Sequence, residues 1–199
     1  MPQIRFEKLS KYYLESCALK EATGVINQGD KFLVLGENGS GKSTFLKLIS
    51  GQISPSGGKI TIDDRPFVNE SRRRFAILGE SKFIYLDLTI KENLGLSTAL
   101  EKNEVENLCS EFGLDYLSSR TVRQLSSGQK QKVSAVKAIS SKSDFLVLDE
   151  PLNFLDTDSK IKLVNILEAS NKTVVLVSHE SDYFSQFKKM EIKRGVLFC

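Results

Sequence analysis

The hydrophobic and polar positions of the chain alternate between short strand-like runs and helix-like stretches. Residues 4–7 and 59–63 are apolar at every second position, which predicts strands with one buried face. Longer continuous apolar runs are typical of strands buried on both faces, as in a parallel sheet covered by helices. These runs are residues 32–35, 145–148 and 174–177, with residues 75–78 as a weaker candidate.

Apolar residues recur at helical spacing between these runs. Helices are expected over residues 42–50, 89–100, 104–112, 127–140 and 158–169. Thr89 and Glu92 have the spacing of a capping box, in which each side chain binds the other residue's backbone N–H. Residues 82–142 are rich in helix and lack a convincing buried strand, so they indicate a helical insertion between two strands of an α/β core.

The composition is that of an ordinary globular domain. The chain has 199 residues, of which 40% are hydrophobic and 27% are charged, and this size fits a single domain. Its apolar runs are far shorter than the roughly 20 residues that cross a membrane. Residues 1–7 contain no apolar stretch of the signal-peptide type, so we expect a cytoplasmic protein.

Charge, cysteine and histidine usage exclude some kinds of site. Cys17, Cys109 and Cys199 lie far apart and predict reduced thiols. His179 is the single histidine, which argues against a metal site of several His and Cys ligands. The net charge of +3 does not predict nucleic-acid binding by itself. The basic cluster at residues 72–74 is either a solvated surface or a contact for a phosphate or a partner.

A phosphate-binding motif follows directly on the strand predicted at residues 32–35. Residues 36–44 read G-E-N-G-S-G-K-S-T and fit G-x-x-x-x-G-K-[ST], with a helical pattern after them. Glycines let backbone N–H groups surround phosphate oxygens, and the helix N-terminus adds partial positive charge. We expect Lys42 to neutralise the β- and γ-phosphates, Ser43 to bind Mg²⁺ and Thr44 to lie near the α-phosphate. The rest of the cradle is Gly36, Asn38, Gly39, Ser40 and Gly41.

Two acids end the apolar run at residues 145–148. Asp149 is expected to hold Mg²⁺, as an Asp at this strand end does in other P-loop proteins. Successive strand residues point in opposite directions, so Asp149 and Glu150 cannot share one role. Glu150 is therefore expected nearer the γ-phosphate, where it orients or deprotonates the attacking water.

Five further segments resemble motifs of the ABC ATPases, in the order of that family. Residues 125–129, L-S-S-G-Q, resemble the LSGGQ signature, with Ser127 in place of its first glycine. The other segments resemble the start of the domain with its adenine-stacking aromatic, the helix after the signature, the DEPTxxLD segment with its D-loop, and the switch-histidine segment. They are residues 9–13, 130–136, 149–156 and 177–180. The chain is identified as a member of this family over essentially its whole length.

The resemblance implies an α/β fold with a P-loop NTPase core and a parallel sheet. It adds an N-terminal antiparallel β-subdomain and a helical insertion. Residues 1–199 would form a single ABC ATPase domain, with the helical subdomain at about residues 82–142.

The resemblance also implies that two copies pack head to tail and enclose two ATP molecules. Each ATP would touch the phosphate loop of one copy and the signature of the other. Tyr13 would stack on adenine, and His179 would contact the γ-phosphate and hold the attacking water. The remaining residues assigned to the nucleotide site are Ser126, Ser127, Gly128, Gln129 and Asp156.

The sequence departs from the family at two positions. Counting back from the landmark at residues 88–94 places Glu80 where the family has its Q-loop glutamine. A carboxylate there can still ligate Mg²⁺, so Glu80 is counted as a catalytic and metal-binding candidate, although its charge can alter hydrolysis. Ser127 adds a Cβ where backbone meets phosphate, which predicts a tolerated change with weaker ATP-driven dimerisation. Because Lys42, Asp149, Glu150 and His179 are present, the resemblance implies an active hydrolase.

The resemblance predicts the ATPase subunit of a membrane transporter whose spans lie on a separate permease chain. The subunit would sit at the inner face of the cell membrane, with residues 80–96 forming a groove for a permease helix. Its compact size is similar to that of haem-export and small two-component exporter ATPases. One alternative is a soluble ABC ATPase acting on nucleic acid or ribosomes, although no nucleic acid is expected. Another is an ATP-gated module that does not transport.

Overall fold

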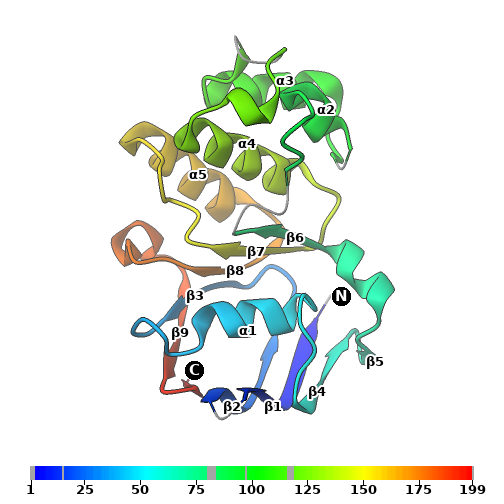
Figure 1. The fold of residues 1–199 in the computed structure, drawn as a ribbon, viewed down its shortest axis with the longest axis vertical. Helices are drawn as coiled ribbons and strands as arrows, with labels where there is room; N and C mark the ends of the chain where they lie inside the picture. Colours follow the sequence, from blue (N-terminus) through cyan, green and yellow to red (C-terminus); the bar gives the residue numbers. More distant parts are fainter. Residues whose placement is uncertain (1–2, 15, 80–83, 97, 116–118, 199) are drawn as a thin grey trace.

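The larger of two sheets is built from the continuous apolar runs. The computed structural model describes residues 3–14, 16–79, 84–96, 98–115 and 119–198. The strand order of this sheet is β10-β9-β3-β8-β7-β6 (Figure 1), and all neighbours are parallel except the β10–β9 pair. The strands are β3 (Lys31–Leu35), β6 (Phe75–Leu78), β7 (Phe145–Asp149), β8 (Thr173–Val177), β9 (Lys188–Lys193) and β10 (Val196–Phe198).

The smaller sheet is antiparallel along its paired strands, with the order β2-β1-β4-β5. Its strands are β1 (Ile4–Tyr13), β2 (Ser16–Ile26), β4 (Gly57–Ile62) and β5 (Arg65–Pro66). The strand expected at residues 4–7 is thus too short, and β2 was not expected. Register shifts interrupt the β1–β2 pairing, and Lys8 and Glu21 have positive φ angles of 48° and 46°. Bulges of this kind break the alternation that reveals a strand in a sequence.

The helices follow the predicted order, with one clear difference in length. They are α1 (Lys42–Ile49), α2 (Ile90–Gly95), α3 (Lys102–Glu111), α4 (Ser127–Ser140) and α5 (Thr157–Ala169), with 3₁₀ turns η1 (Asn69–Arg74), η3 (Val122–Gln124) and η4 (Ser181–Phe184). The capping box of Thr89 and Glu92 is confirmed at the start of α2. The expectation that this helix runs to residue 100 is wrong, because Ala99 and Thr98 instead bind the carbonyl oxygen of Ser140.

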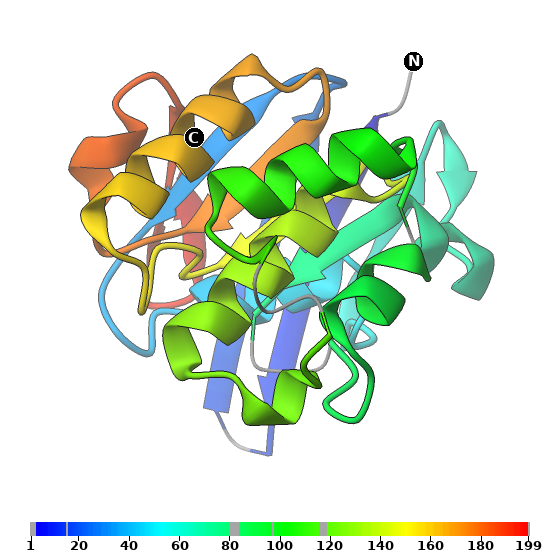
Figure 2. The same ribbon diagram turned by 90° about the horizontal axis from the view of Figure 1, so that it is seen from above.

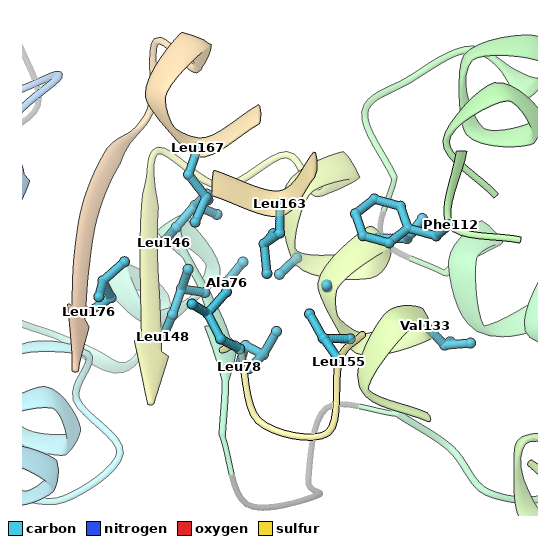
Figure 3. Packing of buried hydrophobic residues seen from close by; sticks show 14 of the residues in the cluster. Ala76, Leu78, Phe112, Val133, Leu146, Leu148, Leu155, Leu163, Leu167 and Leu176 are labelled. Carbon is cyan, nitrogen blue, oxygen red and sulfur yellow. The ribbon is translucent and has the colours of Figure 1, made fainter. Parts of the chain in front are cut away.

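Alternate residues of the parallel strands face two different hydrophobic layers. In β7, Phe145 and Val147 pack in a cluster with α1 and the antiparallel sheet. Leu146 and Leu148 pack in the opposite cluster with α4 and α5. Figure 3 shows this second layer, in which leucines of α5 lie against those of β7. Burial on both faces explains the continuous apolar runs of these strands.

The described residues between β6 and β7 form helices and contribute no strand to either sheet. Seen from above, these green to yellow-green helices gather in front of the strands (Figure 2). Two isolated bridges, Thr89–Thr121 and Thr98–Ser141, hold the connecting segments together. In the part of the chain that the structure describes, no helix has the length and apolarity to span a bilayer.

Candidate nucleotide site

Neighbouring parallel strands bring three predicted segments to one edge of the sheet. The phosphate loop follows β3, Glu150 follows β7, and His179 lies just after β8. In the sheet register, Val177 pairs with Val34 on one side and with Asp149 on the other. The carboxyl ends of β3, β8 and β7 are therefore level, which is where open α/β sheets bind ligands.

The phosphate loop is packed tightly on its inner side and open at its tip. α1 begins directly after Gly41, whose φ is 110°. A Cβ at Gly41 would lie 2.1 Å from the carbonyl oxygen of Ala18, so only glycine fits between the loop and β2. At Gly39, by contrast, a Cβ would meet no heavy atom within 4 Å. The exposed tip includes Asn38.

Lys42 is held across the loop by backbone carbonyls. Its side chain is buried, and Nζ donates to the carbonyl oxygens of Gly36 at 2.7 Å and Glu37 at 2.9 Å. Ser40 Oγ is also buried, and it has no hydrogen-bond partner among the described residues. Ser43 and Thr44 lie half-buried in the first turn of α1. The loop thus combines an ammonium group, a helix N-terminus and an unpaired hydroxyl, which suits a phosphate chain.

Asp149 and Glu150 are not both residues of one strand, contrary to the expectation from the sequence. Asp149 is the last residue of β7, but Glu150 lies beyond the strand and has a φ of 50°. Strand alternation therefore does not set the direction of the Glu150 side chain. Its backbone N–H still donates to the carbonyl oxygen of Val177 at 2.9 Å, which keeps this turn against β8.

His179 contacts the Glu150 carboxylate through both its backbone and its ring. The His179 N–H donates to Glu150 Oε2 at 3.1 Å. Its Nε2 lies 3.3 Å from Oε1, but not in hydrogen-bond geometry, and this buried oxygen has no hydrogen bond within the described residues. The imidazole itself is 62% exposed. One carboxylate oxygen is thus oriented by the backbone while the other keeps its acceptor capacity.

The signature segment forms the start of α4. The Ser126 hydroxyl accepts the Gln129 N–H at 3.2 Å, and Gln129 Oε1 accepts the Ser126 N–H at 3.0 Å. Ser126 and Ser127 are exposed at the helix N-terminus, where backbone N–H groups lack helical partners. A Cβ at Gly128 would lie 2.7 Å from the carbonyl oxygen of Phe154. The signature therefore packs directly on the D-loop of its own chain.

Asp156 ends the D-loop and caps α5. Its Oδ1 accepts the Ser159 N–H at 2.9 Å, and its Oδ2 lies 2.7 Å from Lys132 Nζ. The hydrogen bond from Lys132, with that from Ser159, holds the pKa of the Asp156 carboxyl far below its usual range. Lys132 belongs to α4, so this ion pair joins the signature helix to the D-loop. No local pattern predicts this pair, because Lys132 lies on α4 and Asp156 caps α5.

Tyr13 lies at the end of β1, near the strand β2 that borders the phosphate loop. The Tyr13 side chain is 45% exposed, and Lys11 Nζ lies 5.3 Å from its ring centroid. Lys11 also donates to the carbonyl oxygen of Ser54, which ties the end of β1 to the segment after α1. Glu80, the candidate at the Q-loop position, lies outside the described residues.

The available donors fit a magnesium ion bound together with phosphates. The Ser43 hydroxyl and the Asp149 carboxylate are hard oxygen donors. Ser43 lies in the first turn of α1, after β3, and Asp149 ends β7 at the same edge of the sheet. No group of three or more His, Cys, Asp or Glu side chains placed to hold a metal occurs in the part of the chain described. Mg²⁺ commonly takes only one or two protein carboxylates and completes its shell with water and substrate phosphates.

Comparison with known proteins identifies the family. Residues 19–153 match the ABC transporter family. A putative ABC transporter ATP-binding protein of Bartonella quintana is 29% identical over 198 residues, covering 94% of this chain and 87% of the relative. The thiamine import ATP-binding protein of Escherichia coli K12 is 30% identical over 167 residues, covering 77% of this chain and 72% of that protein.

A solved structure of the ATP-binding subunit of an ABC transporter has the same fold. Its TM-score is 0.87 at 27% identity, covering 98% of this chain and 88% of that one. The chain therefore belongs to the ABC transporter family. It is one of the ATP-binding cassettes of that family, an ABC ATPase, and the predicted fold class is confirmed.

Proposed function

We propose that this chain hydrolyses Mg-ATP as a head-to-tail homodimer and powers a transporter whose membrane spans lie on a separate permease subunit. One observation carries the catalytic part of the proposal. Glu150 is oriented by the His179 N–H, and its Oε1 accepts no hydrogen bond within the described residues. Glu150 follows β7 at the same edge of the sheet from which the loop with Lys42 leaves β3. A general base needs this combination of fixed orientation and free acceptor capacity.

The phosphate loop would hold the nucleotide. Lys42 would neutralise the β- and γ-phosphates, and Thr44 would lie near the α-phosphate. The backbone of Gly36, Asn38, Gly39, Ser40 and Gly41 would complete the cradle. Tyr13 ends β1, and β1 pairs with β2, the strand that borders the phosphate loop. The exposed ring of Tyr13 would therefore stack on the adenine.

Ser43 and Asp149 would hold Mg²⁺, with Glu80 as a further candidate. The ion would neutralise charge on the phosphates during the reaction. Glu150 would orient and deprotonate the attacking water, and His179 would hold that water while its backbone fixes the carboxylate. Ser43, Asp149, Glu150 and His179 lie at or just beyond the carboxyl ends of β3, β7 and β8, which are adjacent in the sheet.

The signature would complete the site of a second copy of the chain. Ser126, Ser127 and Gly128 present hydroxyl and backbone N–H groups at the N-terminus of α4, with Gln129 and Asp156 beside them. Such a terminus attracts a phosphate without needing a lysine. An isologous pairing would use each signature once and each phosphate loop once.

The whole of residues 1–199 would form one ABC ATPase domain, with residues 82–142 as its helical subdomain. An apolar groove of about 630 Å³ lies between α2 and α3. Its lining includes Ile90, Leu94, Leu100, Val105 and Leu114. This groove overlaps the segment expected to receive a permease helix, so the subunit would work at the inner face of the membrane. No observation favours a nucleic-acid partner or a non-hydrolysing module.

The direct test compares ATP binding and phosphate release by the wild type and by Lys42→Met. The wild type is expected to bind and hydrolyse ATP in Mg²⁺, and the variant to lose binding because its Nζ can no longer meet the phosphates. Lys47→Met, in the last turn of the same helix, is the matched control and should bind as the wild type does. A wild-type chain that fails to bind ATP would contradict the proposal.

A further inference from the structure

We propose that Lys160 is a positioning residue for hydrolysis. Its ion pair with Glu180 fixes the turn that carries His179, and through that turn it fixes the Glu150 carboxylate. The inference rests on the proposed function, since it concerns the reaction at Glu150.

The ammonium group of Lys160 contacts both carboxylate oxygens of Glu180. Its Nζ lies 2.8 Å from Oε1 and 2.7 Å from Oε2. The Lys160 side chain is only 20% exposed and that of Glu180 is 37% exposed, so water screens this pair less than an ordinary surface pair. The ammonium group also lies 6.0 Å from the ring centroid of Tyr183. Glu180 is therefore fixed from α5, which lies outside its own loop.

The turn at Glu180 is short and lacks the repeating backbone hydrogen bonds of a helix or a strand. Glu180 has φ −91° and ψ 61°, close to an inverse γ-turn, and its N–H donates to Ser178 Oγ at 3.1 Å. The preceding residue is His179, and its N–H is the donor that hydrogen-bonds to the Glu150 carboxylate within the described residues. A displacement of Glu180 therefore shifts this donor and reorients the carboxylate.

The same helix is tied to the signature. The Lys160 N–H donates to the carbonyl oxygen of Asp156 at 3.0 Å, so Lys160 lies in the first turn after the D-loop. Asp156 in turn pairs with Lys132 of α4. Two ion pairs thus connect α4, α5 and the turn at His179. Lys160 is the side chain of α5 that completes this connection, although it does not touch the Glu150 carboxylate.

The test measures kcat and KM for ATP in Lys160→Met, which keeps the aliphatic stem and removes the charge. We expect kcat to fall about five- to tenfold while KM changes less than about twofold, because the residue positions the base and does not bind ATP. The charge-swapped double variant Lys160→Glu/Glu180→Lys is expected to recover most of the lost rate. Lys162→Met is the matched control on α5, since Lys162 Nζ binds the carbonyl oxygen of Glu111 instead.

A second readout does not depend on hydrolysis. His179 is the single histidine of the chain, so its imidazole proton signals in an NMR spectrum are unambiguous. They should shift in Lys160→Met, return in the double variant and stay unchanged in Lys162→Met. Unchanged kcat and unchanged His179 signals in Lys160→Met would overturn the inference. An inactive wild type whose His179 signals respond to Lys160 would instead refute the proposed function alone.

Discussion

Gly128 of the signature lies against Phe154 of the D-loop so closely that a side chain cannot enter between them. A Cβ at Gly128 would lie 2.7 Å from the Phe154 carbonyl oxygen, inside normal contact distance. Phe154 itself has a φ of 64° and a ring that is 75% exposed. The start of α4 and the D-loop are therefore one packed unit, so a change in either displaces the other.

Gly128→Ala should separate the start of α4 from the D-loop. The added methyl group forces the start of α4 away from the D-loop, at a cost of about 1–3 kcal/mol in the free energy of unfolding. Because the signature of one copy would face the nucleotide of the other, ATP-driven dimerisation should be lost as well. Urea denaturation measures the first effect, and size-exclusion chromatography with Mg-ATP measures the second.

Ser127→Gly is the contrasting variant at the neighbouring position. Ser127 is exposed, so removal of its side chain frees backbone without opening a cavity. Its dimerisation with ATP should be as strong as that of the wild type or stronger. Equal dimerisation by Gly128→Ala and the wild type would contradict the assigned role of the signature.

The sequence predicted the parts of the fold whose apolar pattern is set by burial alone. The three continuous runs at β3, β7 and β8 became buried parallel strands, and the spacing of the phosphate loop placed α1 correctly. β2 was missed because bulges interrupt its alternation. The early end of α2 depends on hydrogen bonds from residues 98 and 99 to Ser140, far along the chain, which no local pattern reveals.

The site shows the same division. The sequence singled out Lys42, Glu150 and His179 because each belongs to a motif with fixed local spacing. The structure shows Lys132 and Lys160 as the ion-pair partners of Asp156 and Glu180, which no such local spacing indicates. Such partners depend on how the helices pack, so only the structure identifies them.

Arg74 should contribute to stability, unlike the arginines beside it. Its guanidinium lies 2.7 Å from both Asp63 and Asp144, joining the turn after β4 to the residue before β7. Arg74→Met should lower the free energy of unfolding by about 1–2 kcal/mol, measured by urea denaturation, because these bonds are partly shielded from water. This pairing gives one member of the basic cluster at residues 72–74 a structural role.

Arg73→Met provides the control, because Arg73 is exposed on η1. Its unfolding free energy should stay within about 0.5 kcal/mol of the wild-type value. If the two variants lose equal stability, the bridge from Arg74 to the two aspartates is not what stabilises this junction.

The Lys132–Asp156 pair should make stability depend on pH in one direction. The pKa of Asp156 is lowered in the folded protein, chiefly by its hydrogen bond from Lys132. The unfolded chain therefore binds this proton first, and the stabilisation is present above the unfolded pKa of about 3.9 and lost as pH falls further. The melting temperature of the wild type should exceed that of Asp156→Asn near neutral pH, and the difference should shrink in acid.

Asn is a suitable replacement because it also caps helices well, so the comparison isolates the charge. A difference in melting temperature that stays constant down to acid pH would show that the Asp156 charge does not contribute. Lys132→Met should reproduce the pH dependence of Asp156→Asn, since it removes the other member of the pair.

In the proposed mechanism, Glu150 is the base in a site that a second copy of the chain completes. Glu150→Gln keeps an oxygen that can accept the His179 N–H but removes the charge that takes a proton from water. The measurement is size-exclusion chromatography of the wild type and Glu150→Gln in Mg-ATP, with phosphate release recorded in parallel. We expect the variant to bind ATP, to elute as a dimer and to release phosphate at least about 100-fold more slowly than the wild type. A variant that hydrolyses ATP at the wild-type rate, or that binds ATP and remains a monomer, would contradict this mechanism.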